Sequence, residues 1–393
     1  MSLLKNISDA AKARFPEIPF PHKKDEHWRF ADLKAWGVDA LFPYFSGKVG
    51  GGARCEKLRE LEKTLHAPHS ASLFDGQLVF SDLPEGVEIL TMADAARERP
   101  ELVEKFHSLA VGKFDVLQSS RAEAGVLVRV KNGADVSLDF SFVSKLPLSC
   151  AGAIFEIGEG ARLSLGRTSL AFSGSFSVLR SLYVVGSGAE LEMSSLKLSE
   201  LSAHSYERED FLLSDSARIV DALAQAGLSP SRHEKNYEIS GGGVDVDTRA
   251  FLKISSDNTH DLRTRQMHLA PNSKSDLAVK AAVADSASLA FSGLIRVEPE
   301  AQKTKAYQSC RSLLLSPKAR SQASPILEIC ANDVECSHGC AVSRPDAEEL
   351  FYMAQRGLDP DMSLSLLVRS FAETTFEKIS DRARAEKILG ILF

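Results

Sequence analysis

A short motif recurs along the middle of the chain at a nearly constant interval. Each copy is a turn of small residues followed by a few alternating apolar residues, and a late copy, Asp285–Phe291, is out of phase with the others. A turn and a strand repeated every 20 to 50 residues or so are typical of a solenoid, whose coils bury their apolar faces only by stacking. The in-phase turns lie 27, 28, 28 and 27 residues apart, at Gly133, Gly160, Gly188, Ser216 and Gly243.

The repeats occupy a stretch of short alternating strands that begins near residue 125 and ends near Cys340. Few helix-length apolar patterns separate these strands, which argues against a fold with helices between parallel strands. We therefore expect a mainly β protein with a β-helix core, and a β-sandwich is the alternative. The expected regions are an N-terminal α-rich region over 1–115, the β-helix core over 116–343 and a C-terminal helical domain over 344–393.

Helical patterns flank the repeats on both sides. In the C-terminal region, Gly357 ends one helix at the position that a helix C-cap prefers, and Ser380 is placed to cap a later helix ending near Leu392. Such a helical tail suits either an interaction module or an end cap for the solenoid. The other expected elements are helices over 6–15, 56–66, 92–110, 345–357 and 362–379, and strands over 77–81 and 87–91.

The composition excludes several classes of function. The 47 basic and 53 acidic residues give a formal charge of −6 without a long basic block, so nucleic acid is a poor candidate partner. The sequence has no run of about 18 apolar residues and no apolar leader, so we expect a cytoplasmic protein without membrane contact. Six cysteines in 393 residues are too sparse for a disulfide scaffold, so reduced thiols are expected. No phosphate-binding G-x-x-x-x-G-K-[ST] loop is present, which predicts no nucleotide hydrolysis by this chain.

Three thiols and an imidazole lie within eleven residues, at Cys330, Cys336, His338 and Cys340. Residues two apart on a strand share a face, so the last three would point the same way. A rise of about 3.3 Å per residue spreads them over roughly 13 Å, too far for one zinc ion to collect all three. Cys336 and His338 could share an ion with groups from elsewhere, or could simply be packed. Cys330 and Cys340 are interpreted as small buried hydrophobic residues.

The residues around this cluster resemble a known family. The most specific stretches are Leu313–Ser316, Pro325–Ile329, Asn332–Gly339 and Glu349–Leu358, and His27–Leu33 is a weaker match. Over most of its length the chain is similar to the SufB/SufD family of iron–sulfur cluster assembly proteins, and within that family to its SufD-type subunits. It departs from the family pattern directly after Gly339, where Cys340 and the residues up to Pro345 replace a small residue followed by Thr-Val-Gly.

The resemblance implies a right-handed parallel β-helix between helical regions, in a non-catalytic subunit. It implies a heterodimer with a SufB-like paralogue, joined through the β-helix, and a SufC-like ATPase on the C-terminal helices, where Phe351, Tyr352, Arg356 and Gly357 would bind it. A homodimer could form in isolation. A transient iron–sulfur cluster or iron would be held at the interface rather than bound permanently by this chain. The interface residues implied are His338 and Cys336 as metal ligands and Cys310, which stands where the SufB paralogue has its essential cysteine.

Two other functions stay open at this point. The first is a purely structural clamp within the same complex, in which the cysteines and the histidine are only packed. The second is a β-helix enzyme acting on polysaccharides, for which Asp245 and Asp247 would form the paired carboxylates. His260 and His268 have no recognisable nucleophile nearby and are interpreted as satisfied core or surface histidines.

Overall fold

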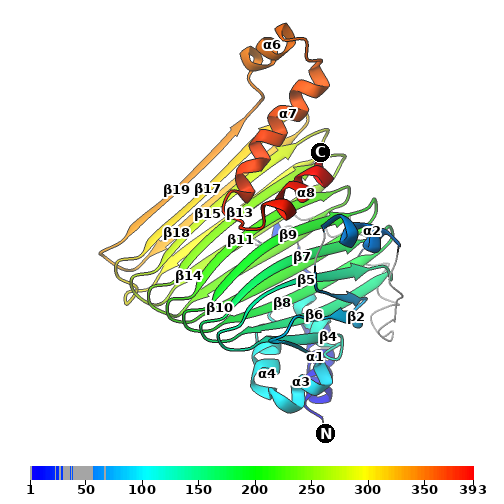
Figure 1. Ribbon diagram of the computed structural model, residues 1–393, viewed down its shortest axis with the longest axis vertical. Helices are drawn as coiled ribbons and strands as arrows, with labels where there is room; N and C mark the ends of the chain where they lie inside the picture. Colours follow the sequence, from blue (N-terminus) through cyan, green and yellow to red (C-terminus); the bar gives the residue numbers. More distant parts are fainter. Residues whose placement is uncertain are drawn as a thin grey trace.

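The computed structural model describes residues 2–22, 24, 25, 28, 29, 36, 38, 56–65 and 68–393. Its centre is a β-solenoid of about eight turns over residues 125–343, in which successive strands alternate between two sheets (Figure 1). The expected mainly β fold with helices at both ends is confirmed, and the sandwich alternative is wrong because each strand pairs in parallel with the strand one coil away.

One sheet contains the odd-numbered strands and the other the even-numbered ones. Antiparallel pairs occur only at the start, between β1 and β2 and between β3 and β4, within the described residues. The odd sheet consists of β1 (Ser70–Phe74), β5 (Asp135–Ser144), β7 (Arg162–Ala171), β9 (Glu190–Ser199), β11 (Arg218–Gly227), β13 (Asp245–Ile254), β15 (Lys274–Val283), β17 (Lys305–Leu314), β19 (Glu335–Ser343) and, at its edge, β2 (Gln77–Asp82). The even sheet consists of β3 (Val87–Thr91), β4 (Gly125–Val130), β6 (Leu148–Ile157), β8 (Phe176–Val185), β10 (His204–Leu213), β12 (Ser231–Ile239), β14 (Thr259–His268), β16 (Ser288–Val297) and β18 (Arg320–Ile329).

The repeated turns form one corner of the solenoid. All five have positive φ, between 56° and 70°, a conformation that favours Gly and explains the small residues there. Asp285 also has positive φ, but it lies between β15 and β16, at the opposite corner. The late copy of the motif is therefore out of phase because each coil has two corners, and not because the repeat slips. The opposite corner also has positive φ at Gly174, Ser202 and Ser256.

An aromatic ladder fills the space between the two sheets. Phe155, Tyr183, Phe211 and Tyr237 occupy the same register position in successive even strands. Their ring centroids are 4.9, 4.5 and 4.6 Å apart, and all four rings are fully buried. Because identical positions stack at the strand spacing of about 4.8 Å, one aromatic position per coil is enough to build a continuous apolar column.

Four of the N-terminal helices, α1 and α3 to α5, cover part of the outer face of the even sheet, whereas α2 packs through Leu58 on Phe74 and Val143 of the odd sheet. The expected helix over 92–110 is two helices, because Pro100 lacks an N–H and disfavours helical backbone at Arg99, whose φ is −137°. The short helix over 113–119 was not predicted, since its seven residues are too few to show a clear period. The helices are α1 (Leu3–Glu17), α2 (Glu56–Leu65), α3 (Met92–Glu98), α4 (Pro100–Ser108) and α5 (Lys113–Ser119).

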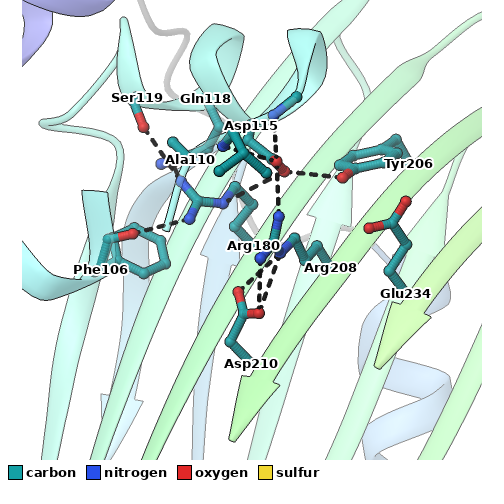
Figure 2. A network of polar contacts seen from close by, with 12 residues as sticks. Phe106, Ala110, Asp115, Gln118, Ser119, Arg180, Tyr206, Arg208, Asp210 and Glu234 are labelled. Atoms are coloured by element: carbon teal, nitrogen blue, oxygen red, sulfur yellow. Dashed lines mark hydrogen bonds and ion pairs between the residues drawn. The ribbon is translucent and has the colours of Figure 1, made fainter. Parts of the chain in front are cut away.

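A buried polar network joins α5 to the even sheet (Figure 2). Asp115 accepts hydrogen bonds from Tyr206 Oη at 2.8 Å and Arg208 Nη1 at 2.9 Å, and Arg180 donates to the Phe106 carbonyl at 2.8 Å. Burial opposes ionisation of Asp115, but the two arginines outweigh it and lower its pKa. The N-terminal helices are thus held to the solenoid by charges that are costly to separate.

The C-terminal helices cover the outer face of the odd sheet. Val368, Phe376 and Ile388 pack against Leu196 and Phe251 of the strands, whereas α6 projects away from the solenoid (Figure 1). Gly357 follows α6 with φ +85°, as a C-cap requires. None of the described helices is long and apolar enough to cross a membrane. The elements are α6 (Ala347–Gln355), α7 (Pro360–Glu373), a 3-10 turn (Thr374–Phe376) and α8 (Arg382–Leu392).

The cap expected at Ser380 is wrong by one residue. Asp381 caps α8, because its carboxylate accepts the backbone N–H of Arg384 at 2.9 Å. Ser380 instead donates its hydroxyl to Glu192 Oε1 at 2.7 Å and ties the start of α8 to β9. Both the Asp381 carboxylate and the Ser380 hydroxyl could cap the helix. Asp381 does so because the Ser380 hydroxyl is already bonded to Glu192.

Candidate functional site

The last coil of the solenoid has no successor. Within the described residues, β18 and β19 end their sheets, so no further strand pairs with their outer edges. Nearly all of β19 is exposed, whereas the strands of the central coils are mostly buried. We call the surface formed by β18 and β19 the open end. It is an unpaired strand edge of the kind that other proteins cover.

The cysteine and histidine cluster lies on the inner side of this open end. Cys336, His338 and Cys340 pair in register with Ala306, Gln308 and Cys310 of β17, respectively. Paired residues on neighbouring parallel strands point to the same side of a sheet, and the three β17 residues are buried inside the solenoid. The three β19 side chains therefore also lie on the inner face of the odd sheet. They are uncovered there because no further coil follows β19.

The residues predicted for the site differ in their surroundings. Cys336 is half-buried against Ile295 and Ala306, and burial raises the pKa of its thiol. His338 is exposed. Cys310 is 2% exposed, and burial together with the neighbouring Cys340 raises its pKa to about 12. Thiol and imidazole groups are suitable ligands for iron.

The interpretation of Cys330 and Cys340 as buried residues is wrong. Both are exposed. Cys330 lies just after β18, in the turn that leads to β19, and Cys340 is on the inner face of β19, beside the sheet edge where a next coil would pair. Strand periodicity correctly predicts which way Cys340 points, but its exposure depends on the end of the solenoid, which a local pattern does not reveal.

A second group of potential metal ligands lies deep inside the solenoid and was not predicted. Ligand atoms of Glu207, Glu209 and His233 all lie within 4.8 Å of one another, and His233 Nε2 is 2.8 Å from Glu209 Oε2. The i, i+2 spacing of the two glutamates was a visible signal. Alternation alone could not tell whether that pair faces the core or the solvent.

Cations already surround these carboxylates. Lys197 Nζ is 3.0 Å from Glu207, Lys235 Nζ is 2.7 Å from Glu209, and Arg167 contacts both glutamates. Burial opposes ionisation of Glu207, but Arg167 and Lys197 outweigh it and lower its pKa to about 2. A dication placed among three cations would be repelled, so the group is better described as an ion-pair cluster. With Asp221, which binds Lys235 at 2.6 Å, three anions balance three cations.

The carboxylate pair considered for a polysaccharide enzyme is not arranged for catalysis. Asp247 is buried and forms ion pairs with Arg249, at 2.9 Å, and with Lys378. A carboxylate neutralised by two cations is a poor general acid or base at neutral pH. Asp247 instead fixes the 3-10 turn region of the C-terminal helices to β13.

A second exposed surface lies on the C-terminal helices. Phe351 and Tyr352 of α6 are 65% and 56% exposed, and the Arg356 guanidinium lies 5.2 Å from the Tyr352 ring centroid. A groove of about 530 Å³ runs beside them and is lined by Leu314 and Leu364, among others. Apolar side chains this exposed and clustered are typical of a protein-binding surface. Met362 and Leu366 of α7 extend the exposed apolar surface.

The N-terminal motif over His27–Leu33 is described only in part. Trp28 and Arg29 are described, and the other five residues lie outside the described residues. Trp28 packs on Tyr206 with the ring centroids 6.1 Å apart, and the Arg232 guanidinium lies 3.8 Å from its ring centroid. Trp28 therefore packs over the polar network that holds α5.

Two family models match this chain. The model described as SUF system FeS cluster assembly, SufBD core domain, matches residues 144–371, and the model of the SufBD protein N-terminal region matches residues 1–136. The chain is 26% identical over 411 residues to the protein ABCI7, chloroplastic, of Arabidopsis thaliana, with 96% of this chain and 83% of the relative covered. It is 27% identical over 384 residues to the iron-sulfur cluster assembly protein SufD of Escherichia coli K12, with 94% and 88% covered. These identities do not separate the SufB branch from the SufD branch.

Proposed function

This chain belongs to the SufB/SufD family of the SUF iron–sulfur cluster assembly system, and we propose that it is a SufD-type subunit of a three-component assembly complex. In this proposal it pairs with a SufB-like paralogue through the open end, and a SufC-like ATPase supplies the energy. The cluster is the cargo of the complex, built where the two solenoids meet. The choice of branch rests on the residues at Asn332–Gly339 and Glu349–Leu358, which resemble those of SufD-type subunits.

The open end is the observation that carries this proposal. It combines an unpaired strand edge, which a second solenoid can cover, with thiol and imidazole groups that suit iron. Cys336 and His338 are too few to complete an iron coordination shell alone. A facing chain would supply the remaining ligands, and Cys310 lies directly beneath as a further thiol.

Partner docking explains the exposed surface on the C-terminal helices. The chain has no nucleotide-binding loop, so ATP hydrolysis must come from another subunit. In this proposal the ATPase binds Phe351, Tyr352 and Arg356, with Gly357 ending the helix that presents them. Because α7 and α8 pack on the odd sheet, movement of the ATPase would be transmitted to the solenoid through a rigid contact.

Co-expression with both partners tests the proposal. Capture of the tagged chain should recover the SufB-like and SufC-like proteins together with iron and sulfide. His338→Ala should abolish the iron and sulfide without disturbing the complex. Ser337→Ala is the matched control, because it lies on the same strand but pairs with Tyr307 on the outer face. Wild-type iron and sulfide in an intact His338→Ala complex would refute the role of the open end.

The structural clamp is the second candidate, and the packing of Cys336 favours it. This thiol is half-buried against apolar neighbours, as expected for a residue that only fills space. Anaerobic iron titration of the assembled complex separates the two functions. A clamp predicts the same iron stoichiometry for the wild type and for His338→Ala, whereas a cluster site predicts a loss.

A further inference from the structure

A row of side chains on the outer face of the odd sheet changes from apolar to charged within a few coils. Leu170, Leu198, Ala226 and Lys253 occupy the same register position in β7, β9, β11 and β13. Neighbouring strands lie about 4.8 Å apart, so the row is about 14 Å long. It begins with two leucines, continues with a small alanine and ends in an ammonium group. Such a row suits a ligand that is apolar at one end and anionic at the other.

The row forms part of the wall of a groove with a volume of about 390 Å³. The other walls are Lys57 of α2, Ile391 of α8 and the corner of the solenoid that follows the odd strands. Two leucines of this corner, Leu201 and Leu228, line the groove although they are 63% and 45% exposed. Pockets for small molecules typically have volumes of about 300 to 1,000 Å³ and mostly apolar walls with few polar groups. The groove therefore has the size and the lining of a small-molecule site.

Lys253 has hydrogen-bonding capacity left for an anion. An ammonium group has three N–H donors, and Lys253 Nζ donates to the Leu392 carbonyl at 2.6 Å. The same nitrogen lies 4.6 Å from the centroid of the Phe393 ring. Burial lowers the pKa of Lys253, and no carboxylate among the described residues offsets this effect. A carboxylate that bound the free N–H groups would stabilise the charge in this half-buried position.

The other lysine of the groove is already neutralised. Lys57 Nζ lies 2.5 Å from Glu200 Oε1, and the second oxygen of Glu200 accepts the backbone N–H of Ser173 at 3.1 Å. Glu200 follows β9 directly, so it lies two strands, or about 10 Å, from the strand that carries Lys253. An anionic head group would therefore bind at the Lys253 end of the groove, and an apolar tail would extend from there over Ala226 and Leu198.

We propose that this groove binds a free medium-chain carboxylic acid, such as decanoate. Its carboxylate forms an ion pair with Lys253, and its hydrocarbon chain lies along Ala226, Leu198 and Leu170. Burial of the chain supplies most of the affinity, at about fourfold per methylene group, and the ion pair selects an anionic head group. The site lies on the coils from β7 to β13, away from the open end, so it does not depend on the proposed function.

Isothermal titration calorimetry of the full chain tests the site, with decanoate kept below the concentration at which it forms micelles. We expect one equivalent of decanoate to bind. Decanol has the same chain with a neutral head group and should bind about tenfold more weakly, because it cannot form the ion pair. Octanoate has two methylene groups fewer and should bind about fifteenfold more weakly than decanoate.

Two lysine variants separate the ion pair from non-specific attraction. Lys253→Met keeps an apolar side chain of similar length but removes the charge. It should lower the affinity for decanoate about tenfold and leave that for decanol unchanged. Lys280→Met is the matched control, because Lys280 is also half-buried on the odd sheet and donates to a helix carbonyl, that of Phe371, at 3.1 Å. Lys280 does not line the groove, so this variant should bind decanoate like the wild type.

Leu228→Asp is a second test at an exposed position, where loss of the fold is not expected. It places a carboxylate beside the bound chain and should abolish binding, and circular dichroism of each variant checks that the solenoid is folded. Equal affinity for decanoate and decanol, unchanged decanoate binding by folded Lys253→Met, or uptake of many equivalents would overturn the proposal. A dimer in sedimentation that Leu228→Asp dissociates would also overturn it, because a second copy of the chain would then cover the groove.

Discussion

Three of the four histidines that are buried among the described residues should make this protein sensitive to mild acid. Burial lowers the pKa of His107 and of His260 to about 3, and that of His268 to about 4. Within the solenoid, His260 Nδ1 lies 2.8 Å from both Gln225 Nε2 and Ser231 Oγ. Burial and the positive charge of Lys197 both oppose its protonation, so a second positive charge there would be costly in the core.

The sign of the effect follows from the two pKa values. An unfolded histidine has a pKa near 6.5, so above that pH the histidine is neutral in both the folded and the unfolded state. Its titration then does not change the free energy of unfolding. As the pH falls from 6.5 towards 3, His260 binds a proton in the unfolded chain but stays neutral in the native fold. The free energy of unfolding therefore decreases. A pH of about 5 lies about 1.5 units below the pKa of an unfolded histidine, and each unit lowers the free energy of unfolding by about 1.4 kcal/mol. The loss is therefore about 2 kcal/mol per histidine.

The three histidines together would then remove about 6 kcal/mol at about pH 5, a large part of the 5 to 15 or so kcal/mol typical of folded domains. We predict that His260→Gln removes one third of this loss. Urea unfolding of both proteins should be followed by circular dichroism and tryptophan fluorescence, because agreement between the probes supports a two-state treatment. The stability difference between wild type and variant should shift by about 2 kcal/mol in favour of the variant between about pH 7 and pH 5. An equal difference at both pH values would refute the reasoning.

Three further variants test the packing and the partner surface. Phe211→Ala interrupts the aromatic ladder and should cost about 3 to 5 kcal/mol in urea unfolding, whereas Leu201→Ala, at a side chain that is 63% exposed, should change stability by less than about 0.5 kcal/mol. Asp115→Ala leaves two buried arginines without their shared carboxylate and should lower the free energy of unfolding by about 3 to 5 kcal/mol. Hydrogen exchange in α5 should become faster, and unchanged exchange would contradict the anchoring role of Asp115. Phe351→Ser should weaken capture of the SufC-like ATPase by about 2 kcal/mol or more without lowering the melting temperature, and Glu348→Ala on the same helix should not; equal capture by both variants would argue against this surface.

The period of the solenoid could be predicted from the sequence because the corners impose a local requirement. In the coils from Gly133 to Lys303, the corner between an even strand and the next odd strand has one residue with positive φ, which favours Gly and small polar residues. Most strands between corners are 10 residues long. The opposite corner was harder to recognise because its residues vary more, from Gly174 to Ser202, Ser256 and Asp285. Only the structure shows that all four lie at the same corner of the solenoid, between an odd strand and the next even strand.

The candidate site could be predicted along one strand but not across strands. A period of two places Cys336, His338 and Cys340 on one face whatever the fold. The pairing of Cys340 with Cys310 depends on the lengths of both intervening corners, and these vary from coil to coil. A change of one residue in either corner would move Cys310 to the other face of the sheet. The cross-strand pair was therefore beyond what motif spacing could show.

The position of the cluster at the last coil links its chemistry to assembly. In a solenoid, each coil is stabilised mainly by its two neighbours, so a terminal coil has half of the stacking contacts of a central one. The buried ion-pair cluster at Glu207 lies in the middle of the stack, where cations and carboxylates enclose one another and leave no position for an exchangeable ligand. Cys340 and His338 lie instead on the coil whose inner face is exposed, so a ligand can enter and leave there. A partner that covers this coil would enclose the ligand, and the same contact would stabilise the fold.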